Sequence, residues 1–508
     1  MNLQALAFIA TLALAALVRL YRLGEIPNGF SPDEASYGYN GYSLLLTGKD
    51  RFGHAFPLFA DNFGDLIATS YMWLTAPAIA LFGLNEFAVR LPAALVGIAT
   101  VFVIYKLGEI FVNRWVGLLA ALLLTLSPWH IQVSRYAERS PLLPLCFCLG
   151  LLLFLRWQAR GGPKLGWSAL CFGLCFYTYA SARVFAPIFI GGLLVVYHRP
   201  LRDAGREAVW ALGILVLLAL LALPHWFSSA GMARAELLLE FAPSTWLANY
   251  LSYFSPDYLF FNGDSEIRHS LVDMGQLHLF ELALVPLGAF FLLRRRRPED
   301  VLIGLWLVFY PIPAAFTAPT HAIRSVIGAP LFALLSACGI YQLVLFFGER
   351  TRWLMGAGCG GLLLWGALSY GQRYFFEYSA YAAVSWNYGM REAFNYAESG
   401  LHQRVYISNR FFLPHIFALF YTAYPPDQYQ QAPLRVAQGH WRYSRFTCGR
   451  YQVAPLAQID AVSPDCQNEL LVVLAGAARE MAERTRYELV HTVAVPDGRA
   501  LIEIYECQ

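Results

Sequence analysis

An adjacent pair of acids, Asp33 and Glu34, is the part of this sequence best suited to chemistry. The pair comes soon after an N-terminal stretch of roughly 20 apolar residues, so it lies close to the end of a predicted membrane span. A carboxylate at a membrane surface can accept a proton from a hydroxyl group that attacks a lipid-borne substrate. We therefore interpret Asp33 as a candidate general base, with Glu34 and the later Glu138 as further candidate catalytic acids.

The same acids also fit a purely local role at a helix start. Ser31 and Glu34 have the S-x-x-E spacing of a capping box, and Pro32 suits the first helical position. Adjacent helical residues point about 100° apart. Glu34 can therefore turn back to cap the helix while Asp33 faces the membrane surface, and both interpretations can hold together.

Basic groups recur in the segments predicted to lie on the same outer side. Glu138 has Arg135 three residues before it, so a local ion pair is the simpler interpretation of that acid. The planar guanidinium group of arginine suits a pair of phosphate oxygens, although a single arginine is more often a helix-end residue that reaches water. The candidate substrate-binding residues are Arg135, Arg183, His321, Arg324, Tyr37 and Tyr179.

The elements that must position these residues are membrane spans. Of the 508 residues, 57% are hydrophobic and only 14% are charged, which indicates a polytopic α-helical membrane protein. No basic run interleaved with aromatic residues points to a nucleic-acid partner. Eleven candidate spans lie near residues 3–20, 86–108, 114–132, 140–158, 165–181, 183–198, 207–227, 277–293, 300–317, 323–347 and 352–372.

The distribution of Lys and Arg predicts the orientation. Short loops rich in these residues, among them residues 294–297, should face the cytoplasm. The N-terminus is then cytoplasmic, and the long segments 21–85 and 228–276 are extracytoplasmic. We expect a transmembrane domain over 1–373, with its catalytic first outer loop at 21–85. A small α/β extracytoplasmic domain should follow over 374–508, with strands near 405–408, 470–474 and 501–505.

The cysteines favour neither a metal site nor an extensive disulfide framework. Most of the nine lie in predicted spans, where they suit apolar packing. Three fall in the outer tail, and Cys448–Cys466 is the favoured pair if a disulfide forms there. No pair of residues has zinc-ligand spacing, so the sequence predicts no structural metal and no required cofactor, although a divalent cation is compatible with it.

The order of these features resembles the GT-C membrane glycosyltransferases, with glycosyltransferase family 39 the best fit. That group includes protein O-mannosyltransferases and lipid A aminoarabinose transferases. The resemblance rests on the Asp-Glu pair in the first outer loop, on the segment from Tyr71 to Pro92, and on the segments 127–137, 177–183 and 321–330. The Lys-Pro-Pro stretch of aminoarabinose transferases is absent, since residues 66–70 are Leu-Ile-Ala-Thr-Ser, which argues against that sugar.

The resemblance implies an inverting transferase in a bacterial plasma membrane. Its donor would be a polyprenyl-phosphate sugar, and its acceptor hydroxyl would belong to a glycan, a lipid or a protein. Asp33 matches the family's catalytic acid, Glu138 falls where relatives carry a second functional acid, and Arg324 falls where a basic residue meets the donor phosphate. Two alternatives stay open at this point: a transporter or flippase of lipid-linked sugars, and a non-catalytic subunit on a degenerate transferase core.

Overall fold

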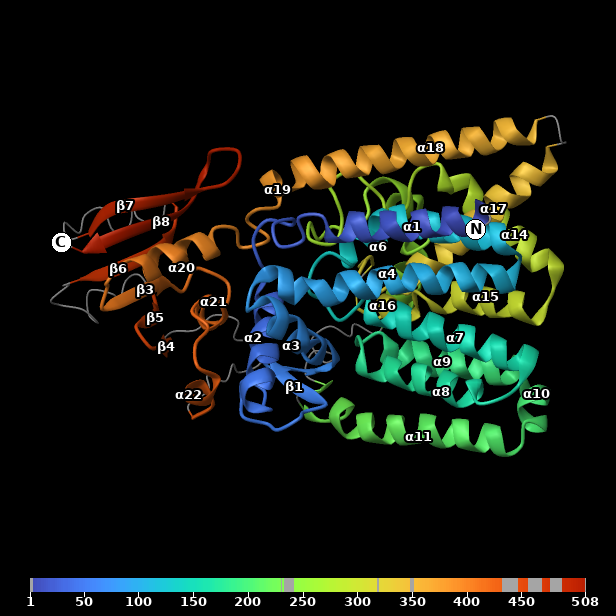
Figure 1. Cartoon of the computed structure of the whole chain (residues 1–508), viewed down its shortest axis with the longest axis horizontal. Helices are drawn as coiled ribbons and strands as arrows, with labels where there is room; N and C mark the ends of the chain where they lie inside the picture. The colour runs from blue at the N-terminus through green and yellow to red at the C-terminus, as the bar shows by residue number, and fades with distance from the viewer. Residues whose placement is uncertain are drawn as a thin grey trace. The chain divides into compact units, whose positions relative to one another are not determined.

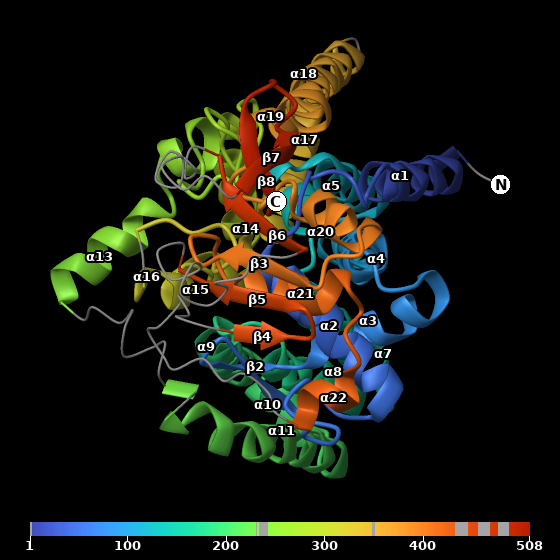
Figure 2. The same ribbon diagram turned by 90° about the vertical axis from the view of Figure 1, so that its left-hand side faces the viewer.

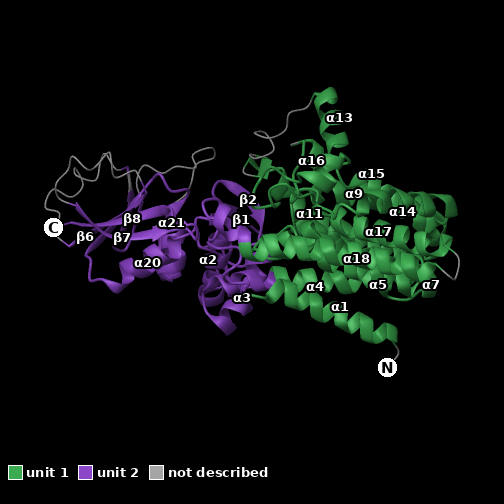
Figure 3. Ribbon diagram, turned by 90° about the horizontal axis from the view of Figure 1, so that it is seen from above, with its two compact units in different colours: residues 1–21, 93–376 green, residues 22–92, 377–508 purple. Residues whose placement is uncertain are grey.

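The chain divides into two compact units in a computed structural model (Figure 3). Unit 1 comprises residues 1–21 and 93–376, and unit 2 comprises residues 22–92 and 377–508. Nearly all of the segment 21–85, expected as the first outer loop of the transmembrane domain, is thus grouped with the C-terminal tail, together with the start of the expected span 86–108. The described residues are 3–229, 231–232, 242–317, 319–347, 351–431, 446–455, 468–475 and 487–507.

Helices long enough to cross a membrane identify a multi-pass membrane protein (Figure 1). Among the described residues, six helices satisfy both the length and the composition that a span requires. They are α1 (Leu3–Leu20), α4 (Glu86–Phe111), α7 (Leu142–Arg160), α11 (Arg206–Trp226), α17 (Gly328–Phe346) and the segment Arg352–Tyr381 that begins with α18 (Arg352–Gln372).

The remaining predicted spans contain shorter helices. Two of these spans are interrupted by proline, which lacks the amide hydrogen that a continuing helix needs. Helix α6 begins at Pro128, just after α5 ends at Leu126, and Pro311 lies between α15 and α16. The elements are α5 (Arg114–Leu126), α6 (Pro128–Val133), α8 (Lys164–Leu174), η1 (Cys175–Tyr177), α9 (Ala182–Val196), α14 (Glu281–Arg295), α15 (Pro298–Phe309) and α16 (Ile312–Ala315). The total of eleven spans stays a prediction.

Close helix packing builds the interior of unit 1. Helix α17 packs against both α14 and α5. At the first of these contacts a Cβ atom on Gly288 would lie 1.9 Å from the carbonyl oxygen of Leu335, and one on Gly339 would lie 2.2 Å from that of Leu284. Only glycine allows the two backbones to approach this closely, as is typical of helices packed within a membrane. The connecting elements are α10 (His198–Asp203), α13 (Pro243–Ser252) and η2 (Asp257–Phe261).

Unit 2 combines a short N-terminal region with a six-stranded sheet. In the N-terminal region the hairpin of β1 and β2 follows one helix along the chain and precedes another. The elements are α2 (Pro32–Thr47), β1 (Phe59–Asn62), β2 (Asp65–Ala68) and α3 (Ser70–Phe82). The sheet has the order β4-β5-β3-β6-β8-β7 (Figure 2). Its strands are β3 (Arg404–Ser408), β4 (Phe446–Cys448), β5 (Tyr451–Ala454), β6 (Glu469–Leu474), β7 (Tyr487–Ala494) and β8 (Ala500–Cys507). The predicted α/β domain is therefore confirmed.

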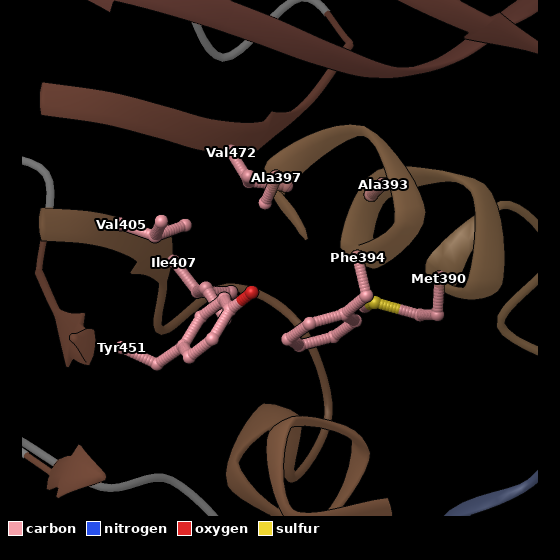
Figure 4. A pocket seen from close by; sticks show the side chains of 8 residues that line it. All are labelled: Met390, Ala393, Phe394, Ala397, Val405, Ile407, Tyr451 and Val472. Atoms are coloured by element: carbon pink, nitrogen blue, oxygen red, sulfur yellow. The ribbon is translucent and has the colours of Figure 1, made fainter. Parts of the chain in front are cut away.

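The central strand β3 organises this sheet because it pairs in parallel with both β5 and β6. Helix α20 (Met390–Ser399) lies against these strands, with Phe394 directed toward them (Figure 4). A small apolar cavity remains there, lined by Met390, Ala393, Phe394, Ala397, Val405, Ile407, Tyr451 and Val472. The other helices of this region are α19 (Tyr378–Tyr381), α21 (Pro414–Tyr421) and α22 (Pro426–Gln431).

The disulfide expectation is wrong. Cys448 is a buried free thiol on β4, and burial raises its pKa to about 12, so it stays protonated at neutral pH. Cys507 on β8 is disulfide-bonded. Cys466 lies outside the described residues. Sequence spacing could not decide this pairing, because which thiols meet depends on the strand order of the sheet.

Candidate active site

The start of α2 has the capping geometry that its sequence predicts. Ser31 Oγ accepts a hydrogen bond of 3.3 Å from the backbone N–H of Glu34. In return Glu34 Oε2 accepts one of 2.9 Å from the backbone N–H of Ser31, which completes the capping box. This reciprocal pair fixes the first turn of the helix, and with it the direction in which Asp33 leaves the backbone.

The side chain of Glu34 is buried in unit 2 and is bound there by Arg90. Its two oxygens accept from Arg90 Nε at 2.8 Å and from Arg90 Nη2 at 3.2 Å, and both side chains are fully buried. The same guanidinium also donates to the carbonyl oxygens of Leu23, Pro27 and Gly29. A buried forked pair of this kind holds a loop and a helix start in one geometry. The structure therefore gives Glu34 a positioning role.

Gly29 allows this loop to close around Arg90. Its φ is +85°, a left-handed conformation that glycine adopts without strain. A Cβ atom at this position would also lie 2.4 Å from the carbonyl oxygen of Trp386. The guanidinium of Arg90 lies 5.5 Å and 5.9 Å from the ring centres of Phe30 and Trp386, which encloses the charge between aromatic faces.

Asp33 differs from Glu34 because it keeps an available oxygen. Its side chain is half-buried, and Oδ1 accepts a hydrogen bond of 2.8 Å from Asn62 Nδ2 at the end of β1. Among the residues that the structure describes, none donates a hydrogen bond to Oδ2. One oxygen thus fixes the orientation of the carboxylate, and the other can receive a proton from a hydroxyl group.

A buried polar chain fixes the side chain that holds Asp33. Asn62 Oδ1 accepts from Ser36 Oγ, which in turn accepts a 2.6 Å hydrogen bond from Arg51 Nη1. The backbone N–H of Arg51 donates to Asn40 Oδ1 at 3.0 Å. Because Ser36 must use the oxygen of the Asn62 amide, the amide nitrogen is left to face Asp33. The chain Arg51–Ser36–Asn62 therefore orients the candidate base.

Sequence reasoning did not find Arg51, Asn62 or Arg90. Each is an ordinary polar residue in the segment 22–92, and its role depends on the fold of that segment. Tyr37 was predicted to contact substrate, yet its side chain is 1% exposed and its ring centre lies 5.6 Å from that of Tyr71. In this position Tyr37 packs α2 against α3.

The other predicted site residues belong to unit 1, and three of them lie together there. Glu138 forms an ion pair of 3.7 Å with Arg139, and the guanidinium of Arg139 lies 5.5 Å from the ring centre of Tyr179. Both charged side chains are largely buried. Glu138, Arg139 and Tyr179 therefore form one polar and aromatic cluster that joins the segment after α6 to the segment before α9.

Two of the predicted arginines donate to backbone carbonyl groups of unit 1. Arg135 donates to the carbonyl oxygens of Val18 at 2.5 Å and Tyr21 at 2.7 Å, and its guanidinium lies 4.9 Å from the ring centre of Phe375. Arg183 donates to the carbonyl oxygen of Gly231 at 3.2 Å. Both arginines therefore contribute to the packing of unit 1.

Arg324 is in a different situation. Its side chain is half-buried, and among the described residues it forms no hydrogen bond and no ion pair. Its positive charge acts on Tyr253 nearby. Burial raises the pKa of Tyr253, and the charge of Arg324 partly opposes that rise. Of the three predicted phosphate-binding arginines, Arg324 has its donors most available. His321 lies near Asp264, with 4.0 Å between His321 Nδ1 and Asp264 Oδ2.

Part of the chain is similar in sequence to known proteins. The family described as dolichyl-phosphate-mannose-protein mannosyltransferase matches residues 69–227. The Bacillus subtilis (strain 168) protein named "Putative mannosyltransferase YycA" is 26% identical over 153 residues, which are 30% of this chain and 22% of that protein. The chain thus matches only about a fifth of the length of this curated relative.

Solved structures extend the similarity to the whole chain. The apo structure of ArnT from Cupriavidus metallidurans matches with a TM-score of 0.65 and 13% identity, covering 99% of this chain and 97% of that one. The undecaprenyl phosphate complex of the same protein matches with a TM-score of 0.62 and 12% identity, covering 98% and 97%. The Archaeoglobus fulgidus oligosaccharyltransferase, tethered to an acceptor peptide, matches with a TM-score of 0.52 and 12% identity, covering 99% and 74%.

These similarities confirm the resemblance seen in the sequence. The chain is a polytopic membrane protein with the GT-C fold of these structures, and its residues 69–227 are similar to the mannosyltransferase family.

Proposed function

We propose that this protein is an inverting glycosyltransferase that moves a sugar from a polyprenyl-phosphate donor to an acceptor hydroxyl at the outer face of a bacterial plasma membrane. The observation that carries the proposal is the state of Asp33: half-buried, held through one oxygen by Asn62, and open at the other. The undecaprenyl phosphate complex of the structurally similar ArnT supports a lipid-phosphate donor.

In the proposed reaction the acceptor oxygen attacks the anomeric carbon of the sugar. Its proton passes to Asp33 Oδ2 as the bond between that carbon and the phosphate oxygen breaks. The lipid phosphate leaves with the electron pair of the broken bond, so the leaving group needs no general acid. A proton on Asp33 then returns to solvent before the next turnover.

The arginines serve the departing phosphate. We assign its binding first to Arg324, whose guanidinium is not engaged by any described residue, with Arg183 as a second contributor. Positive groups fixed in advance lower the energy of the charge that develops on the phosphate in the transition state. Glu138 and Tyr179, joined through Arg139, are proposed to contact the acceptor.

Purified protein and a panel of polyprenyl-phosphate sugars test the proposal. We expect one donor to be consumed and free polyprenyl phosphate to appear only with an acceptor present. Asp33→Asn should abolish this transfer while the melting temperature stays close to that of the wild type. Asp497→Asn, which alters a carboxylate in the turn between β7 and β8, is the control and should transfer normally.

Two results would overturn the proposal. Normal turnover by Asp33→Asn would remove the general base. Movement of an intact lipid-linked sugar across vesicles, with no donor consumed in the presence of acceptors, would support a flippase.

A further inference from the structure

Three potential metal ligands, Asp264, His269 and His321, lie close together in unit 1. Of these, only His321 was among the candidate substrate-binding residues. Asp264 and His269 follow η2, and His321 precedes α17. Asp264 Oδ2 lies 2.9 Å from His269 Nδ1 and 4.0 Å from His321 Nδ1. One ligand atom from each residue lies within 4.8 Å of the others. Because His321 is more than 50 positions from the other two residues, no zinc-ligand spacing is visible in the sequence.

The carboxylate of Asp264 is oriented by the backbone of both segments. Oδ1 accepts from the backbone N–H of Glu266 at 2.9 Å, and Oδ2 accepts from that of Ala322 at 2.7 Å. Its side chain is only 2% exposed. Hydrogen bonds of this kind hold a ligating carboxylate in position in metal sites.

The two imidazole rings are placed to share this carboxylate. The ring centres of His269 and His321 are 4.9 Å apart, and their side chains are 8% and 20% exposed. A distance of 4.0 Å is too long for a direct hydrogen bond between His321 and Asp264. It is short enough for one ion to bind both groups with bonds of about 2.0–2.2 Å after a small movement of the rings.

An ordinary hydrogen-bonded Asp–His pair occurs elsewhere in the chain for comparison. In unit 2, Asp50 Oδ2 lies 3.0 Å from His54 Nδ1, and the His54 side chain is 54% exposed. Among the described residues, no second histidine joins that pair to form a three-ligand group. The Asp264 cluster is therefore distinguished from a simple pair by its third ligand and by its burial.

We propose that Asp264, His269 and His321 bind one divalent transition-metal ion of the Zn²⁺ type. Two imidazole nitrogens and one carboxylate oxygen favour this class over Mg²⁺ and Ca²⁺, which prefer sets of oxygen ligands. Three protein ligands leave one coordination position for water or for an anion. The ion ties the segment after η2 to the segment that contains His321 and Arg324.

Zinc binding at this site does not depend on the proposed transfer reaction. Tag-free wild-type protein in detergent, stripped with EDTA and dialysed, should take up one equivalent of Zn²⁺ by calorimetry and by elemental analysis. Excess Mg²⁺ should not displace it. Co²⁺ should bind in place of Zn²⁺ and give the visible absorption of a four-coordinate site, and Zn²⁺ should raise the melting temperature.

Single substitutions locate the site. His269→Gln and His321→Gln should each lose most of the bound zinc, while His54→Gln should retain the full equivalent. Failure of the wild-type protein to bind zinc would overturn the proposal, and so would retention of zinc by both site variants. If a variant does not fold, the wild-type Co²⁺ spectrum decides, because cysteine ligands would add a thiolate charge-transfer band in the near ultraviolet that a site of two imidazoles and a carboxylate lacks. Such a band would overturn the proposal.

Discussion

The side-chain amide of Asn62 donates a 2.8 Å hydrogen bond to one carboxylate oxygen of Asp33. Asn62 cannot turn away without breaking its contact with Ser36, whose hydroxyl is bound by Arg51. Asn62, at the end of β1, thus sets the orientation of the candidate base.

Replacing Asn62 with Ala should lower kcat with little change in KM for the donor, because Asp33 keeps its charge and loses its orientation. We expect a decrease of about tenfold, which corresponds to about 1.4 kcal/mol in the barrier. Steady-state kinetics with the donor that the panel of polyprenyl-phosphate sugars identifies measure both kcat and KM. Asn28→Ala is the control, because the Asn28 amide donates to the carbonyl oxygen of Ser379. An unchanged kcat in Asn62→Ala would show that Asp33 needs no such support.

Glu34→Gln should act on stability more than on chemistry. It removes the charge that balances the buried guanidinium of Arg90, and breaking a buried pair costs about 3 kcal/mol or more. Thermal unfolding in detergent should show a clear fall in melting temperature. Glu25→Gln is the matched control, because it breaks an exposed pair with Arg22, which contributes less than about 1 kcal/mol. A Glu34→Gln protein of normal stability with no activity would instead make Glu34 a catalytic residue.

Arg324→Ala should weaken donor binding and leave stability nearly unchanged, because no described residue bonds to this guanidinium. A lost charge-assisted hydrogen bond costs about 1.5–3 kcal/mol, so KM for the donor should rise about tenfold or more. Arg324→Lys should recover part of the loss, because lysine keeps the charge without the planar fork. Arg373→Ala, which removes hydrogen bonds to the carbonyl oxygens of Val272 and Asp273, is the control. Equal donor KM values for Arg324→Ala and wild type would exclude Arg324 from the phosphate site.

His415 should make stability depend on pH in the acid range. Burial, reinforced by the nearby charge of Arg51, holds its pKa well below the ordinary value of 6.5. Below about pH 6.5 the unfolded chain binds a proton at this residue that the folded chain does not. Its contribution is therefore complete above that pH. As the pH falls below it, stability decreases by about 1.4 kcal/mol per pH unit until the folded pKa is reached.

Melting temperatures at pH 7.5 and pH 5.5 measure this effect. His415→Phe places an aromatic ring between Phe63 and Phe446, which already contact the imidazole, and should lose less stability over this interval than the wild type. The same substitution at the exposed His54 is the control. Identical pH responses of His415→Phe and wild type would contradict the prediction.

Local sequence signals predicted the local structure well. The capping box at Ser31 and Glu34 is present as expected, because its contacts span only three residues. The predicted strands near 405–408, 470–474 and 501–505 correspond to β3, β6 and β8. Helices occur in every predicted span, although proline divides two of those spans more sharply than hydropathy alone shows.

Long-range partners were not predictable in the same way. The partner of Glu34 is Arg90, 56 positions away, and Asp33 is bound by Asn62, 29 positions away. No local pattern in the sequence marks Arg90 or Asn62 as a partner of these acids. The preference for a Cys448–Cys466 disulfide failed for the same reason, since neither spacing nor composition reports which thiols meet.

The sequence alone determined that the chain spans a membrane, roughly where its long helices lie, and that Asp33 and Glu34 stand at a helix start soon after the first apolar stretch, because hydropathy and capping act between near neighbours. Only the tertiary structure decided that Glu34 is neutralised by Arg90 while Asp33 keeps an open oxygen. It also brought His321 to Asp264 and His269. These outcomes depend on packing between distant segments, where burial and the available donors give two adjacent carboxylates different environments.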